Sequence, residues 1–169
     1  MNVCAFLHTH VIKLCYFCKL MAEYTTTIAT LTAPLWQRVG GELTAESMAM
    51  LSADQITLLA YSILRDELLE GGFVQLIHNG YGPFIFLNPF AKVLRLWGLK
   101  DLGKWLYDAR ALYEQTRARL ERPIETDEDF MALYEQYPEW DDFDDYFVEA
   151  EPQITAQVCQ AYINAISHG

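Results

Sequence analysis

The sequence predicts an all-α protein, folded as a single domain that is a compact, irregular bundle of several helices. Apolar residues recur three and four positions apart along most of the chain, which is the spacing of one helix face. Capping residues precede these runs and glycine or proline follows them, whereas no run alternates between apolar and polar residues as a strand would. A chain of 169 residues, 52% of them hydrophobic, is long enough to bury a core of its own.

The predicted helices follow from these start and stop signals. The first begins near Pro34, because proline is favoured in the first turn of a helix. The second starts at Ser52, which forms a capping box with Gln55, and it ends before Gly71-Gly72. The later helices are expected at about 73–78, 89–97, 99–122, 127–137 and 140–150, with a last one after residue 152.

Residues 1–20 are expected to be a leader outside this domain, either unstructured or an over-extended gene start, with the helical domain over 31–167. The leader has no acidic residue, and Met21 reads as a second start. Its CxxC pair has the spacing of a zinc site, but a second well-spaced pair of ligands is missing, so we expect no metal. The potential ligands there are Cys4, His8, His10, Cys15 and Cys18.

Charge divides the chain into a nearly neutral body and an acidic segment. There are 12 Lys and Arg against 23 Asp and Glu, a net charge of −11. Twelve of the acids lie in Glu125–Glu151, and no Lys or Arg follows Arg122. Such a surface repels phosphates, so we expect no direct nucleic-acid partner and no membrane partner.

Aromatic residues run through the acidic segment, so it is expected to be folded rather than a solvated tail. At about 100° per helical residue, Trp140, Phe143 and Phe147 share one face, which would anchor the helix. The acids expected on the opposite, outward face are Asp141, Asp142, Asp144, Asp145 and Glu149. A fully helical course from 125 to 151 would be about 40 Å long and carry one acid per ~3.4 Å, close to the charge spacing of one DNA strand.

A glycine motif follows the second predicted helix. The string Gly71-Gly72-Phe73-x-Gln75-x-x-x-Asn79-Gly80 resembles the signature of a bacterial all-helical family named for a DNA-mimic protein. The Leu-rich helix behind it, the break at Gly98 and the acidic end extend the resemblance over roughly residues 31–166. Members often have Asn before the two glycines, where this chain has Glu70. The resemblance implies a helical, cytoplasmic protein whose carboxylates stand in for DNA phosphates.

The motif residues themselves are expected to form a corner of the fold. Glycine permits positive φ, and Gln75 and Asn79 share a helix face, where they could bond backbone carbonyls or each other. A polar pocket that includes His78 is the alternative.

Signatures of enzymes and metal sites are scarce. The sequence has no phosphate-binding glycine loop, no HExxH and no GxSxG. Outside the leader only His78 and His168 could serve a catalytic triad. The acids of 141–145 lack the glycine and the spacing of an EF-hand. We expect no catalytic residue, no cofactor and no metal.

These observations predict a non-enzymatic acidic protein that mimics DNA charge and occupies the DNA-binding surface of a basic protein, such as a transcriptional regulator. The alternatives are an immunity- or antitoxin-type inhibitor of a basic toxin, and a small enzyme or ligand binder around the glycine motif. A homodimer is left open. The residues expected to bind the partner are Glu125, Asp127, Glu128, Asp129, Glu135, Glu139, Asp141, Asp142, Asp144, Asp145, Glu149 and Glu151.

Overall fold

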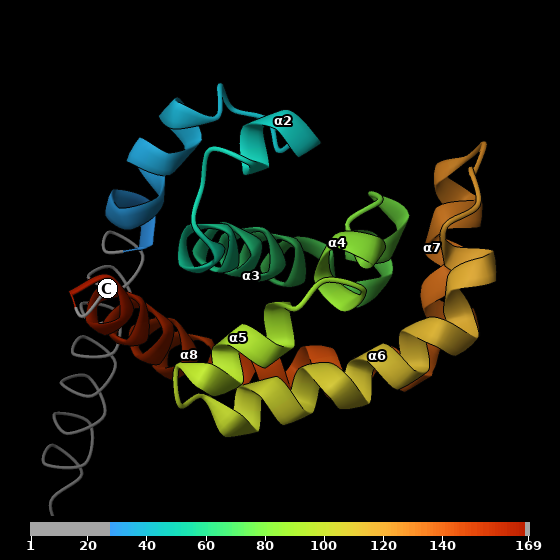
Figure 1. Cartoon of the computed structure of the whole chain (residues 1–169). Coiled ribbons are helices and arrows are strands. Elements are labelled where there is room, and N and C mark those ends of the chain that lie inside the picture. Colours follow the sequence, from blue (N-terminus) through green and yellow to red (C-terminus); the bar gives the residue numbers. More distant parts are fainter. Residues whose placement is uncertain (1–27, 168–169) are drawn as a thin grey trace, which may run out of the picture.

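The computed structural model describes residues 28–167 and confirms the predicted all-α class, because no strand occurs in that range. An unlabelled helix over 28–38 comes first (Figure 1). The labelled elements are α2 (Ala45–Met48), α3 (Ala53–His78), α4 (Gly82–Phe86), α5 (Phe90–Leu96), α6 (Lys100–Leu120), α7 (Asp127–Gln136), the 3₁₀ helix η1 (Pro138–Trp140) and α8 (Asp141–Ser167).

Helix α3 is the centre of the bundle. It contacts α4, α5, α6 and α8, and residues on nearly all of its sides are buried. Leu58, Leu59, Tyr61 and Leu64 have no exposed surface at all. Figure 1 shows α2 and the 28–38 helix over one end of α3 and α7 at the opposite end of the molecule. The fold therefore buries one apolar helix by wrapping amphipathic helices around it.

The glycine motif breaks α3, as predicted. Ser52 and Gln55 form the expected capping box at the start of this helix. Gly71 (φ −157°, ψ 16°) and Gly72 (φ 72°, ψ −169°) then leave the helical conformation, and the chain continues as a second helical piece to His78. The positive φ of Gly72 is a conformation that glycine adopts without steric cost.

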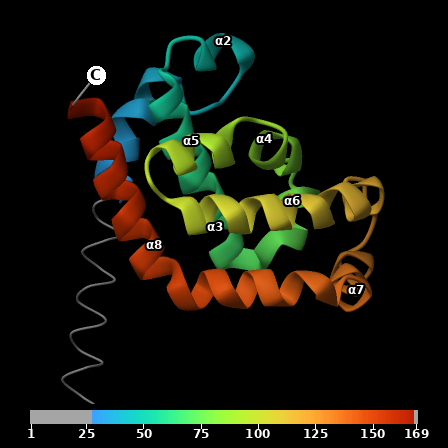
Figure 2. The ribbon, with the colours of Figure 1, turned by 60° about the horizontal axis from the view of Figure 1, so that its bottom comes forward.

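Two helices differ from the prediction because a proline does not mark their ends. Pro34 lies inside the 28–38 helix instead of near its start. Helix α8 runs through Pro152 without interruption, where the sequence predicted two helices. Proline at 152 has no N–H for the carbonyl of Val148, and Figure 2 shows α8 changing direction near its middle. Burial of Ile154 and Val158 beyond the bend keeps the chain helical despite this loss.

No helix between residues 28 and 167 is long and apolar enough to cross a membrane. The same range contains no group of three or more His, Cys, Asp and Glu side chains placed to hold a metal ion. The predicted leader, with its five potential metal ligands, lies outside the described residues, and so does His168.

Candidate protein-binding surface

The start of α8 is anchored by aromatic side chains, as the helical periodicity predicted. Trp140 and Phe147 are fully buried, and Phe143 is half-buried beside them. The ring of Trp140 lies 4.8 Å from that of Phe73 in α3, and the ring of Phe147 stacks 5.7 Å from that of Trp105 in α6. These contacts hold one face of α8 against the bundle and leave the other face to solvent.

Ten of the twelve acids of Glu125–Glu151 are exposed on α7, α8 and the segments between them. Acids in the first turn of a helix also favour the helix itself, and Asp127, Glu128, Asp129, Asp141 and Asp142 have that position. The exposed set is Glu125, Asp127, Glu128, Asp129, Glu135, Glu139, Asp141, Asp142, Asp145 and Glu149.

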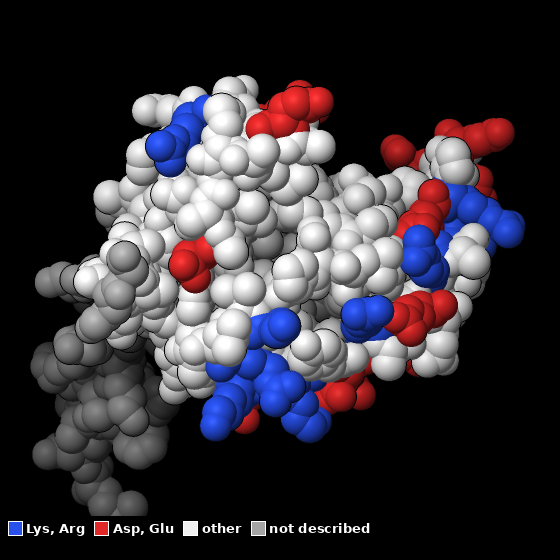
Figure 3. All heavy atoms as spheres, viewed as in Figure 1, with Lys and Arg blue, Asp and Glu red and all other residues white. Residues whose placement is uncertain are grey.

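The exposed acids of α7 and α8 differ from those of α6 in their pairing. On α6, Lys104 pairs with Asp108, and the next two turns repeat this with Arg110–Glu114 and Arg117–Glu121. Figure 3 shows Lys and Arg side chains over α5 and α6, with carboxylates among them. None of the ten exposed acids above is a partner in the ion pairs of residues 28–167. Their charge is therefore uncompensated by contact.

Apolar side chains lie among these carboxylates. Met131 on α7 is 62% exposed, and Tyr146 and Val148 on α8 are 45% and 52% exposed. Single exposed apolar residues are normal on a protein surface, and Met50 and Leu96 are exposed elsewhere, so these three side chains do not by themselves mark an interface.

Glu151 is not part of this surface, contrary to the prediction. Its side chain is 2% exposed, and its Oε1 accepts a hydrogen bond from Nε of Arg65 at 2.6 Å. Thr155 donates its hydroxyl to the same oxygen, and Tyr61 bonds Thr155. Arg65 lies on α3, so this carboxylate joins α8 to the central helix and cannot contact a partner.

Asp144 also departs from the expected outward position. It is half-buried, and its Oδ1 accepts the backbone N–H of Phe73 at 3.0 Å, directly after the break in α3. Burial raises the pKa of Asp144 to about 7, and the nearby charges of Asp141 and Asp145 raise it while the Phe73 hydrogen bond lowers it.

The acidic segment does not form one straight rod. Helices α7 and α8 are joined through η1 and point in different directions, as Figures 1 and 2 both show. The helical length of about 40 Å is therefore not realised as a single line of charge. The carboxylates instead cover the outer sides of two helices.

The amides of the glycine motif bind a side chain rather than backbone carbonyls or each other. Gln75 and Asn79 both donate to Oε2 of Glu67, at 3.2 and 2.9 Å. Glu67 precedes the break and both amides follow it, so these bonds fix the angle between the two pieces of α3. Phe73 is fully buried in the core, and Gly80 has a φ of 86°.

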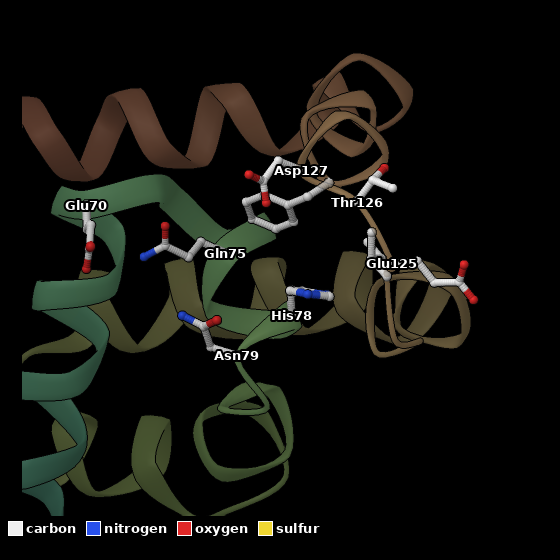
Figure 4. A pocket seen from close by; sticks show the side chains of 9 residues that line it. Glu70, Gln75, His78, Asn79, Glu125, Thr126 and Asp127 are labelled. Carbon is white, nitrogen blue, oxygen red and sulfur yellow. The ribbon is translucent and has the colours of Figure 1, made fainter.

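A polar pocket of about 340 Å³ lies beside the motif. Figure 4 shows Glu70 on one side of it and Glu125, Thr126 and Asp127 on the other, with Gln75, His78 and Asn79 between them. The ring of His78 lies 5.0 Å from that of Phe130, and its Nδ1 is 3.4 Å from the carbonyl of Leu120. The pocket holds three carboxylates and no Lys or Arg.

Sequence reasoning missed Glu70 as a member of the acidic surface. It precedes the acidic segment by more than fifty positions and belongs to the nearly neutral body. Glu70 lies across the pocket from Glu125 and Asp127. The only local signal was that Glu70 directly precedes Gly71-Gly72. A glycine pair does not indicate which distant segment the preceding residue will face.

Comparison with known proteins agrees with this architecture. The family described as DMP19-like protein matches residues 49–166. The DNA mimic protein DMP19 of Neisseria meningitidis serogroup B (strain ATCC BAA-335 / MC58) is 44% identical over 108 residues, which are 64% of this chain and 66% of that protein. The chain thus spans just under two thirds of the length of this relative. The resemblance inferred from the sequence is confirmed: this chain belongs to the DMP19-like protein family.

Proposed function

We propose that this protein occupies the DNA-contacting surface of a basic DNA-binding protein, with the exposed carboxylates of α7 and α8 in the place of DNA phosphates. The observation that carries the proposal is the set of ten exposed acids that have no ion-pair partner among residues 28–167. A related protein is named a DNA mimic. A transcriptional regulator in the cytoplasm is the partner we propose.

The physical basis of the proposed binding is charge complementarity between these carboxylates and the partner's Lys and Arg side chains, together with burial of apolar side chains between the two proteins. Unpaired carboxylates attract Lys and Arg side chains that otherwise contact phosphates, and they accelerate association. The exposed Met131, Tyr146 and Val148 supply apolar area that DNA does not offer. The binding is expected to weaken as salt rises, because exposed charges are screened beyond about 8 Å at physiological ionic strength.

A stripe of acids on α8 provides the test. Asp141, Asp145 and Glu149 follow one another at intervals of four and are all exposed. The triple variant Asp141→Asn, Asp145→Asn, Glu149→Gln removes three charges from this stripe. A matched control removes three exposed charges elsewhere: Glu42→Gln, Glu46→Gln and Asp101→Asn.

Each protein is immobilised and exposed to a lysate of its source organism, and bound protein is eluted with a salt gradient. We expect wild type and control to capture a DNA-binding protein and to displace it from labelled DNA, and the α8 variant to do neither. Equal capture by the α8 variant, or a captured protein that keeps its DNA, would contradict the proposal. A captured nuclease that wild type inhibits would instead support the toxin-inhibitor alternative. The homodimer stays a prediction.

The pocket beside the glycine motif favours a second candidate function, binding of a small organic cation. Three acidic residues and Phe130 line this pocket, and an acidic lining with an aromatic ring suits an amine or guanidinium group. Titration with arginine methyl ester, followed through the NMR signals of His78, tests this. Absence of a change at His78 up to millimolar ligand would contradict it.

A further inference from the structure

We propose that the break in α3 at Gly71-Gly72 is a binding site for the Asp144 carboxylate. This contact holds the first turn of α8, and with it the exposed carboxylates of that turn, in a fixed position. The proposal rests on the proposed function for the role of that surface. Asp144 is a positioning residue here rather than a partner-binding one.

The break in α3 supplies a backbone N–H donor at Phe73 and room for a carboxylate at Gly72. Phe73 is the first residue after it, and a new helical piece begins with amides that have no intrahelical acceptor. Asp144 accepts the Phe73 amide at 3.0 Å, so a side chain 71 positions away performs the role of an N-cap. A Cβ at Gly72 would collide with the Asp144 carboxylate, and Gly72 also has a φ of +72°. Glycine at 72 therefore provides the backbone turn and the room for the carboxylate together.

The acidic segment reaches the break at a second point. Tyr134 of α7 donates its hydroxyl to the carbonyl of Gly71 at 2.8 Å. The two polar backbone groups that flank Gly72 are thus satisfied by α7 and by α8, one each. Trp140, between these two helices, packs on Phe73. Both acidic helices are consequently attached to the same three residues of α3.

The seated Asp144 adds a polar anchor to the first turn of α8, beside the aromatic anchors Trp140 and Phe147. Asp141 and Asp145 lie within one turn of Asp144 and are exposed, so the seated carboxylate holds the helical turn that carries them. Release of Asp144 to solvent would loosen the first turn of α8, where Phe143 is only half-buried, while Phe147 keeps the rest of the helix in place. The exposed acids would then lose their fixed positions.

The contact depends on protonation. The titratable groups that act on Asp144 are Asp141 and Asp145 on its own helix and Tyr134 on α7, and α3 faces it with the Phe73 amide. Burial raises the pKa of Asp144 to about 7, so the carboxyl is protonated below that pH and ionised above it. Burial disfavours the ionised carboxyl more than the Phe73 hydrogen bond favours it, so the seated position of Asp144 loses stability as pH rises from about 4 to about 7.

Amide exchange of Phe73 measures the contact directly. In Asp144→Ala the amide loses its acceptor, and we expect exchange at pH 6 to be roughly 3- to 30-fold faster, the range for a lost capping bond. Asp145→Asn, a neighbouring exposed position, is the control and should exchange as wild type. Asp144→Asn keeps an acceptor of the same size, so we expect it to fold and to restore protection.

The pH profile separates a positioning role from simple packing. In wild type the carboxyl carbon of Asp144 should titrate near 7, and protection of the Phe73 amide should fall as pH rises from about 4 to about 7, beyond the intrinsic increase of exchange with pH. Asp144→Asn should show no such inflection. Unchanged exchange in Asp144→Ala, or an Asp144 that titrates near 4, would overturn the proposal. These measurements need no partner, so they fail independently of the α8 charge variant that tests the proposed function.

Discussion

Substitution of Glu151 by Gln should destabilise the protein far more than any other charge removal in the acidic segment. The carboxylate is 2% exposed and lies 2.6 Å from Nε of Arg65, whose side chain is also largely buried. Gln keeps the size and an oxygen acceptor but removes the charge that compensates the guanidinium. Loss of one member of a buried ion pair costs about 3–5 kcal/mol.

Asp66 reduces this cost. It lies 3.0 Å from Nη1 of Arg65 and is largely exposed, so it can compensate part of the charge from the solvent side. We therefore expect a loss of about 2–4 kcal/mol in the free energy of unfolding. For a domain of this size the melting temperature should fall by roughly 6–15 °C.

Thermal and urea unfolding, followed by far-UV circular dichroism at pH 7, measures the effect. Glu149→Gln is the control, because Glu149 is exposed on the same helix and should change stability by less than about 0.5 kcal/mol. The double variant Arg65→Met, Glu151→Leu should recover much of the loss, because two apolar side chains need no compensation. A melting temperature of Glu151→Gln equal to that of Glu149→Gln would refute this reasoning.

Three further outcomes follow from buried and strained positions. Phe147→Ala should cost about 3–5 kcal/mol in urea unfolding, because the ring is fully buried against Trp105, whereas Tyr146→Ala should cost less than about 1 kcal/mol. Gly72→Ala should cost more than Gly80→Ala: both have positive φ, worth about 1–2 kcal/mol, but only at 72 would the new Cβ meet Asp144. Asp144→Asn should flatten the pH dependence of stability: the raised pKa makes wild type lose stability as pH rises from about 4 to 7, by about 1–3 kcal/mol, and Asn has no proton to lose.

Helix ends were predictable because their signals are local. Ser52 caps α3 and Thr126 caps α7, each through a hydrogen bond to a backbone amide three residues on. Gly98, predicted to end a helix, has a φ of 90°. Each of these contacts joins residues that are close in sequence, so composition and spacing are enough to find them.

Pro152 does not end its helix, because burial of the helix can outweigh the hydrogen bond that proline removes. Pro152 is itself buried, and α8 packs along α3, the most extensively covered helix of the fold. The lost hydrogen bond bends the helix but does not end it. Sequence alone does not show how much burial a helix will gain from a distant partner.

Asp144 and Glu151, the two acids that the prediction placed wrongly at the surface, lie near the edge of the buried face when α8 is projected along its axis. At about 100° per residue Asp144 falls near 300° and Glu151 near 280°, beside Trp140 near 260° on the buried face. Continuing the projection to Glu151 would have flagged it as inward. The partners that make these positions tolerable, Arg65 and the Phe73 amide, lie 86 and 71 positions away and give no local signal.

The acids of α7 and α8 therefore serve more than one purpose, and the structure separates these purposes. Asp127 and Asp141 lie in first turns, where a negative charge stabilises a helix whatever it binds. Glu151 and Asp144 join α8 to α3. Glu135, Asp145 and Glu149 have neither role: they lie beyond the first turn, they are exposed, and no ion pair of residues 28–167 includes them. Folding gives no reason for these charges, and like charges at helical spacing repel one another. The proposed basic partner would give these charges a role that folding does not.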